Sequence, residues 1–174
     1  MSDTLVAGNV LSFFGMVFLA LSALKNKKEE IVLFQIFCYF FDIMANFVLG
    51  GYSGAVVVAA SLARNILVYK NKMSNVAVCV IMTVMTVCGI SVNRHGWIGV
   101  LPVMANAEYT LWLWYGGTNP RGIKISMAAN VLIWAVYDFT IQAFPAFISD
   151  VVIFAVTVFG IWKPDALKKR ASQG

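Results

Sequence analysis

The sequence predicts an all-α membrane protein with seven transmembrane helices, arranged as two parallel three-helix repeats joined by a linker helix. Three observations lead to this fold class. First, 60% of the 174 residues are hydrophobic and only 12% are charged, with a mean hydropathy of +0.80. Soluble domains carry about 25% charged residues, and a soluble core of this size cannot bury so much apolar surface. The second observation is the spacing of the apolar runs, and the third is the one-sided distribution of the basic residues.

Seven apolar runs are long enough, or nearly so, to cross a bilayer, which takes about 20 residues. They lie at 5–24, 31–49, 52–70, 76–92, 98–115, 124–143 and 146–162. The breaks between them are short, such as "KNKKEE" and "GGTNPRGIK", and no tract resembles a soluble domain. We therefore expect a single transmembrane domain over 1–174. The N-terminus "MSDT" has no basic cluster, so we expect the first run to be a retained helix and not a signal peptide.

Basic residues gather at one set of helix ends. With seven crossings, the loops at 25–30, 70–75 and 116–124 and the tail share one side of the membrane, and the remaining loops share the other. The first side carries Lys25, Lys27, Lys28, Lys70, Lys72, Arg121, Lys124, Lys163, Lys168, Lys169 and Arg170. The second side carries only Arg94. By the positive-inside rule the N-terminus lies outside and the C-terminus in the cytoplasm. This topology also explains the net charge of +5, so we expect no nucleic-acid partner.

The chain repeats itself weakly at a distance of 92 residues. With this shift Asn46 falls on Asp138 and Asp42 on Trp134, and each copy continues through a tight turn into another apolar run. Three crossings and a linker separate equivalent helices, so both copies have the same orientation. We therefore expect a first three-helix unit at 5–70, a linker helix at 76–92, a second unit at 98–162 and a cytoplasmic tail at 163–174.

This arrangement of three, one and three helices resembles the SWEET and PQ-loop-like transporters. More specifically, "YSGAVVVAASLARNILVYKNK", "GVLPVMANAEYTLWLW" and "IWAVYDFTIQAFPAFISD" resemble segments of the YgjV-like bacterial inner membrane protein family. The resemblance runs from about Gly8 to Lys163, and its best points are Arg64, Leu101-Pro102-Val103 and Tyr137-Asp138. It implies a helical fold and a bacterial inner-membrane location. The chain has no Pro-Gln pair, so a proline hinge like that of sugar transporters has support only at Pro102.

Polar side chains interrupt the apolar runs at regular spacing. The second run carries Gln35, Tyr39, Asp42 and Asn46, and the sixth carries Ser126, Asn130, Trp134, Tyr137 and Asp138. Spacings of three and four residues place each set on one helix face. The other runs add Ser61, Arg64 and Asn65 in the third, Asn106 and Glu108 on different sides of the fifth, and Asp150 near the outer end of the seventh. We expect these faces to turn toward a shared axis between the repeats.

Charge counting sharpens this expectation. An ionisable side chain in mid-helix costs about 2.5–3.5 kcal/mol on insertion scales. The runs hold four acids, Asp42, Glu108, Asp138 and Asp150, against one base, Arg64. These acids must therefore line a water-filled cavity, carry a proton or find a counter-charge. An acidic cavity suits a neutral or cationic solute better than an anion.

The candidate substrate-binding residues form two groups. The first choices are Asp42, Asn46, Asn130, Trp134 and Asp138, and the second choices are Arg64, Asn65, Asn106 and Glu108. The asparagines at 65, 106 and 130 serve equally well as hydrogen-bonding groups between helices. For Arg64 the favoured interpretation is that it snorkels to the lipid headgroups or pairs with an acid.

The sequence favours a SWEET-like small-solute transporter, with proton coupling as an option, that alternates access around a polar mid-membrane cavity. The alternative is a non-transporting membrane protein that binds a lipid or a protein partner. No nucleophile stands with a base, so no enzyme is expected, and no phosphate loop or Cys/His cluster calls for a cofactor or metal. Cys38, Cys79 and Cys88 lie within runs and are expected to be packing residues. Faces rich in glycine and alanine leave a homo-oligomer open.

Overall fold

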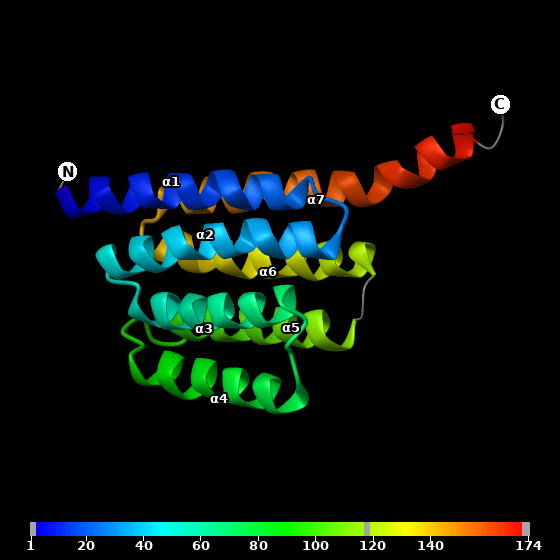
Figure 1. The fold of residues 1–174 in the computed structure, drawn as a ribbon. Coiled ribbons are helices and arrows are strands. Elements are labelled where there is room, and N and C mark those ends of the chain that lie inside the picture. Colours follow the sequence, from blue (N-terminus) through cyan, green and yellow to red (C-terminus); the bar gives the residue numbers. More distant parts are fainter. Residues whose placement is uncertain (1–2, 117–118, 172–174) are drawn as a thin grey trace.

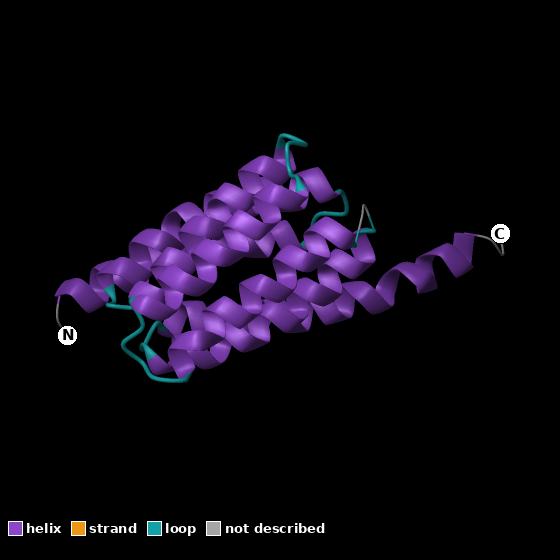
Figure 2. Cartoon of the chain, turned by 90° about the horizontal axis from the view of Figure 1, so that it is seen from below, coloured by secondary structure: helices purple, strands orange, loops and turns teal. Residues whose placement is uncertain are grey.

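The computed structural model describes residues 3–116 and 119–171, and that part of the chain is helical without any strand. The helices are α1 (Asp3–Ala23), α2 (Lys28–Val48), α3 (Tyr52–Tyr69), α4 (Asn75–Ser91), η1 (Ile98–Val100, a single 3₁₀ turn), α5 (Leu101–Tyr115), α6 (Pro120–Thr140) and α7 (Phe144–Ala171). Figure 2 shows that only short loops join them. The prediction of an all-helical chain with seven α-helices is confirmed.

Six of the helices close a ring. Going around it, α1 packs on α2, α2 on α3, α3 on α5, α5 on α6, α6 on α7, and α7 on α1. Figure 1 views the bundle from the side, with α1, α2 and α3 one below another and α7, α6 and α5 partly behind them at the same three levels. The helix α4 lies outside the ring against α3 and α5, so it joins the two sets of helices without entering the ring.

The turns after α2 and α6 have the same backbone structure. Gly50 and Gln142 both have a positive φ, of 78° and 61°, directly after the helix ends. The N–H of Gly51 donates to the carbonyl of Asn46 at 2.8 Å, and the N–H of Ala143 donates to the carbonyl of Asp138 at 2.9 Å. These six-to-one bonds are Schellman caps, which stop a helix at a left-handed residue.

The two central helices also match in length. The ranges of α2 and α6 differ by 92 residues at both ends, and α7 begins 92 residues after α3. The helix α5 ends 92 residues after α1. The distance at which the sequence repeats is therefore also the distance at which the helices repeat.

Two helix boundaries differ from the expected ones by four residues or more. The helix α6 begins at Pro120, four residues before the apolar run at 124–143, because the side chain of Asn119 caps it by accepting from the N–H of Arg121 at 3.1 Å. Proline is well suited to the first helical position that follows. The helix α7 continues to Ala171, so most of the predicted tail at 163–174 is helical, and residues 172–174 lie outside the described residues. The apolar run ends at 162, but the alanine, leucine, lysine and arginine that follow are strong helix formers.

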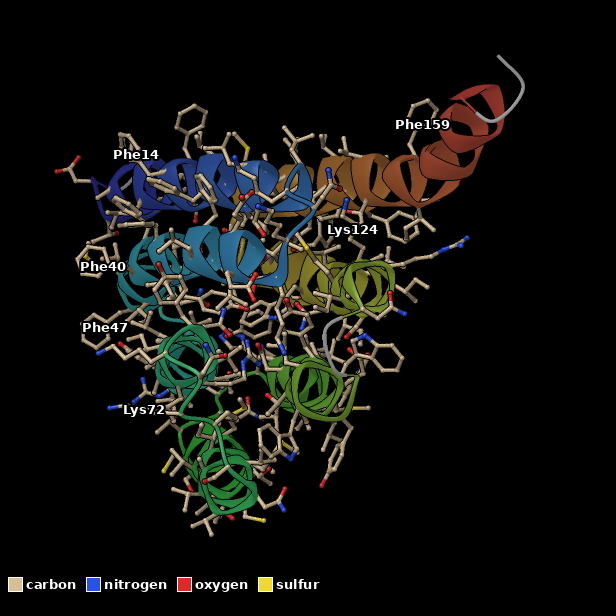
Figure 3. All side chains as sticks on the ribbon, turned by 45° about the vertical axis from the view of Figure 1, so that its right-hand side comes forward. Phe14, Phe40, Phe47, Lys72, Lys124 and Phe159 are labelled. Atoms are coloured by element: carbon tan, nitrogen blue, oxygen red, sulfur yellow. The ribbon has the colours of Figure 1, made fainter. Side chains whose placement is uncertain are left out.

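The bundle is apolar outside, and polar side chains are buried among apolar ones inside it. Figure 3 shows Phe14, Phe40, Phe47 and Phe159 pointing away from it, and each of these side chains is exposed. Buried positions include polar residues such as Ser61, Arg64 and Asn65. By length and composition α1, α2 and α3 can each cross a membrane, and α4 and Phe144–Phe159 are shorter apolar helices. An apolar outer surface that encloses buried polar contacts is typical of proteins in a lipid bilayer and unfavourable in water.

Candidate functional site: an acidic pocket between four helices

A pocket of about 60 Å³ lies between α1, α2, α6 and α7, and Val58 of α3 and Tyr109 of α5 also line it. The side chains and glycines that line it include Ser12, Gly15, Met16, Gln35, Cys38, Tyr39, Asp42, Asn46, Tyr109, Met127, Asn130, Trp134, Asp138, Ser149 and Asp150. The lining runs along α2 from Gln35 to Leu49, which is more than three turns of helix. The pocket therefore extends along the bundle and is not confined to one level.

Three carboxyl groups share this pocket. Asp42 comes from α2, Asp138 from α6 and Asp150 from α7. Oδ2 of Asp42 accepts from Sγ of Cys38 at 3.0 Å. Within the described ranges no lysine, arginine or histidine is paired with any of the three. The pocket therefore carries acidic groups that the surrounding helices do not neutralise by ion pairing.

Several buried polar atoms beside these carboxyl groups have no hydrogen-bond partner. They are Oδ1 of Asn46, Nδ2 of Asn130, Oγ of Ser149 and Oδ2 of Asp150. Buried polar atoms in folded proteins are nearly always paired, with water where protein atoms do not reach. A buried water needs about 10–15 Å³ of such space, so a pocket of this size holds a few water molecules. The pocket is therefore suited to water or to a compact polar solute.

Glycine on α1 makes room for Asp42. A Cβ atom added to Gly15 would collide with Oδ1 of Asp42. The other α1 residues in the lining, Ser12, Met16 and Leu19, carry no charge. The helix α1 therefore supplies a close, neutral wall and leaves the acidic chemistry to α2, α6 and α7.

Two aromatic residues of α6, Trp134 and Tyr137, lie on the side of the pocket that faces the beginning of α3. Trp134 lines the pocket, and its ring meets that of Tyr137 edge to face at 5.5 Å. Tyr137 itself is fully buried outside the lining, where its hydroxyl lies 3.2 Å from Oγ of Ser53 and accepts from the N–H of Gly54 at 3.2 Å. Tyr137 thus holds α6 against the beginning of α3, and Trp134 lies between that contact and the pocket.

All five first-choice residues from the sequence, Asp42, Asn46, Asn130, Trp134 and Asp138, lie in the pocket lining. The four second choices do not. Asn65 and Asn106 are in a hydrogen-bonded cluster between α2, α3 and α5, where Nδ2 of Asn65 donates to Gln35 at 3.0 Å. Oγ of Ser61 donates to Oδ1 of Asn106 at 2.8 Å. The acidic pocket and this closed polar cluster adjoin each other, because Gln35 lines the pocket and also bonds to Asn65.

Arg64 is at the centre of that closed cluster, with no exposed surface. Its guanidinium donates to Oδ1 of Asn65 at 2.9 Å, to Oγ1 of Thr110 at 2.8 Å and to the hydroxyl of Tyr39 at 3.2 Å. It also lies 4.9 Å from the ring centre of Tyr109. The interpretation that Arg64 snorkels outward or pairs with an acid is therefore wrong. Neutral partners from three helices surround it, and a single helix pattern could not show that.

Glu108 lies on the other side of α5 from Asn106, as its spacing predicts. It is exposed, and its Oε1 accepts from Oγ of Ser126 at 2.7 Å. An acid at the bundle surface and a buried amide two residues away cannot contribute to one site. Glu108 therefore stands apart from the pocket.

Asp150 and its neighbour Ser149 are pocket residues that sequence reasoning left out of the site. Each is at least 95% buried, at 5% and 3% exposure. The sequence repeat could have indicated Asp150 as a pocket residue. With the 92-residue shift Asp150 falls on Val58, and Val58 also lines the pocket. Within the described residues, no group of three His, Cys, Asp or Glu side chains is arranged to hold a metal ion.

Comparison with known proteins identifies the family of this chain. The family model for a bacterial inner membrane protein, Imp-YgjV, matches residues 6–168. Neither a curated protein nor a solved structure matches the chain. The matched range includes part or all of each of the seven α-helices, and their apolar outer surface agrees with a membrane location. This chain belongs to the Imp-YgjV family of bacterial inner membrane proteins.

Proposed function

We propose that this inner membrane protein is a small-solute transporter of the SWEET-like type, in which the acidic pocket is the solute site. The observation that carries the proposal is the meeting of Asp42 from α2 with Asp138 from α6 in one pocket. Carboxyl groups inside a membrane protein mark solute, ion or proton pathways more often than packing contacts. The polar groups without partners that surround them leave hydrogen bonds for a bound solute to make.

The proposed mechanism is alternating access, with α1–α3 moving against α5–α7 and α4 acting as the linker. The equal 92-residue offsets of the helices support two units of the same orientation. The helix contacts also support two equivalent units. If a twofold axis relates α1 to α5 and α3 to α7, it must also relate the α1–α7 contact to the α5–α3 contact. Both contacts are present. Transporters with parallel repeats of this kind bind their solute between the two halves, near the middle of the membrane.

The proposed topology has seven crossings, with the N-terminus outside and the C-terminus in the cytoplasm. Contacts near the helix ends support one shared basic end. Nζ of Lys124 donates to Oδ1 of Asn26 at 3.1 Å, and Nζ of Lys28 donates to the carbonyl of Leu113 at 3.2 Å. These contacts join the end of α5 and the beginnings of α2 and α6, which is the side that the positive-inside rule assigns to the cytoplasm.

The charge and size of the pocket limit the solute. Three carboxyl groups and no paired base favour a neutral polyhydroxylated or a cationic solute over an anion. Ligand pockets for drug-sized molecules are typically about 300–1,000 Å³, far above the 60 Å³ found here. A solute larger than a few water molecules therefore enters only when the two halves move apart.

Uptake into proteoliposomes tests the proposal directly. Purified protein is reconstituted and offered sugars, polyols and small amines, with and without a proton gradient. We expect uptake of at least one solute, and loss of that uptake in Asp138→Asn and in Trp134→Ala. Glu29→Gln and Trp97→Ala are matched controls, because both side chains are exposed outside the pocket. Unchanged uptake in the two pocket variants would show that the solute site lies elsewhere.

A non-transporting membrane protein that binds a lipid or a protein partner is the second candidate. The closed cluster around Arg64 favours it, because there the polar groups satisfy one another and leave no space for a solute. If the whole interior behaved in this way, no water-soluble reagent would reach position 130 from either side. Access to that position therefore separates the two candidates.

A further inference from the structure

We propose that the pocket binds a compact zwitterion, whose cationic group lies against the pocket acids and whose anionic group bonds to Tyr39, beside Arg64. The inference rests on the proposed function only for the statement that the bound molecule is transported. Binding itself can be measured in protein that transports nothing. Two parts of the pocket carry the argument, because they offer opposite kinds of polar group.

The first part, which we call the acidic end, offers oxygen atoms. Asp42, Asp138 and Asp150 are the charged residues of the lining, and all three are acids. Oδ1 of Asn46 and Oδ2 of Asp150 are buried there without a hydrogen-bond partner. An ammonium group carries a positive charge and only donates hydrogen bonds. A solute with an ammonium group therefore brings both the counter-charge and the donors that this end lacks.

The second part, which we call the donor end, is formed by Tyr39 and Asn130. The helices α2 and α6 run in the same direction (Figure 1), and Tyr39 precedes Asp42 by three residues while Asn130 precedes Asp138 by eight. Both residues of the donor end line the pocket, at 9% and 8% exposure. The two ends therefore follow each other along the same pair of helices.

Hydrogen atoms at the donor end have no acceptor. The hydroxyl of Tyr39 accepts from Arg64 at 3.2 Å, and within the described residues its own hydrogen has no acceptor. Nδ2 of Asn130 is buried without a partner. Buried donors are nearly always paired in folded proteins. A carboxylate, which only accepts hydrogen bonds, can bond to both groups at once.

Arg64 places a positive charge behind this end of the pocket. Its guanidinium is always protonated, and its hydrogen-bond acceptors within the described residues are all neutral. It lies 4.9 Å from the ring centre of Tyr109, which also lines the pocket. A hydroxyl that accepts a bond from a cation is polarised and donates more strongly. Arg64 therefore favours an anionic group on the hydroxyl of Tyr39 without itself reaching the pocket.

A zwitterion is the solute class that satisfies both ends together. A simple cation leaves the hydrogen of Tyr39 and the charge of Arg64 without a partner, and a simple anion meets the pocket acids with charge of the same sign. A sugar brings hydroxyl groups but no charge to either end. Tyr39 and Asp42 are three residues apart, about 4.5 Å of helix rise, so a few bonds between the charged groups of the solute suffice.

Thermal unfolding of the purified full-length protein in detergent tests the proposal with matched probes. The zwitterions are free glycine, β-alanine and γ-aminobutyrate. Methylamine, ethylamine and propylamine are the same molecules without the carboxylate, and acetate, propionate and butyrate are the same molecules without the ammonium group. Glucose and glycerol are the uncharged probes. We expect at least one zwitterion to raise the unfolding temperature, with an apparent Kd at least tenfold below those of its matched amine, its matched acid and the uncharged probes.

Tyr39→Phe removes the hydroxyl donor and keeps the ring. We expect the affinity for the best zwitterion to fall at least tenfold, to that of the matched amine, while the affinity for the amine is unchanged. Tyr69→Phe is the matched control, because Tyr69 is an exposed tyrosine of α3 outside the pocket lining, and it should change neither affinity. Asp42→Asn should weaken the binding of zwitterion and amine alike. The comparison of probes in the wild type needs no variant to fold.

Two results in the wild type would overturn the proposal: no binding of any zwitterion, or an amine, acid or uncharged probe that binds as tightly as the best zwitterion. An unchanged zwitterion affinity in folded Tyr39→Phe would overturn it as well. The two proposals fail separately. Zwitterion binding by a protein that transports no solute would refute the proposed function alone, whereas uptake of a sugar or an amine without zwitterion binding would refute this inference alone.

Discussion

Gly15 on α1 packs directly against the carboxyl group of Asp42 on α2, with no space for a Cβ atom between them. This contact explains how the side chain of Asp42 fits between α1 and α2 in the pocket lining. Gly15 is therefore as important to the shape of the pocket as Asp42 is. The contact is therefore a place where one methyl group should change function more than fold.

We expect Gly15→Ala to displace Asp42 and to reduce uptake at least tenfold. Overpacking of this kind typically costs about 1–3 kcal/mol, so the protein should still fold. Proteoliposome uptake and thermal unfolding measure the two effects. Gly89→Ala on α4 is the control, since its Cβ would meet only side-chain atoms of Val57 and Val103 at 3.0 Å, outside the pocket. Equal uptake by the two variants would show that transport does not depend on the position of the Asp42 side chain against α1.

Arg64→Lys should lower stability. The lysine ammonium cannot reach Asn65, Thr110 and Tyr39 together as the guanidinium does, and hydrogen bonds to a charged group contribute about 1.5–3 kcal/mol each. We expect a loss of about 2–4 kcal/mol, seen as a lower unfolding temperature in detergent. An unchanged unfolding temperature would mean that the cluster around Arg64 does not stabilise the bundle.

Tyr137→Phe should weaken the contact between α6 and α3. The change removes the hydroxyl that pairs with Ser53 and with the N–H of Gly54, and leaving such buried groups unpaired costs about 1–3 kcal/mol. We expect a lower unfolding temperature, together with faster labelling of a cysteine at Ser53 from outside. Val136→Ala, at a position exposed on the same helix, is the control and should change neither. Labelling as slow as in the parent would show that this contact does not close the outer side.

Single cysteines test the topology in intact cells. Cys79 and Cys88 are first replaced by serine, and an impermeant thiol reagent is then applied to Trp97→Cys and to Lys72→Cys, both at exposed positions. We expect labelling at 97 and none at 72 until the cells are opened. The reverse pattern would place the basic loops outside and would contradict the orientation proposed here.

The sequence predicted the helices and the polar faces of α2 and α6, because both follow from short-range spacing within one run. Asp42 and Asp138 stand on such faces, and both line the pocket. The same reasoning failed for Arg64, whose partners Tyr39 and Thr110 come from two other helices. It also left out Asp150, since the depth of a residue in a run does not show which way its side chain turns. That direction depends on how α7 packs against α1 and α6.

The central claim is that water reaches the space between α2 and α6, and labelling of Asn130→Cys tests it most directly. On a background with Cys38, Cys79 and Cys88 replaced by serine, a small water-soluble thiol reagent is applied to reconstituted protein. Ala105→Cys is the matched control, because that position has no exposed surface and lies outside the pocket. The account predicts that position 130 is labelled and position 105 is protected. Protection of both positions would mean that the polar interior is closed and would contradict a transporter.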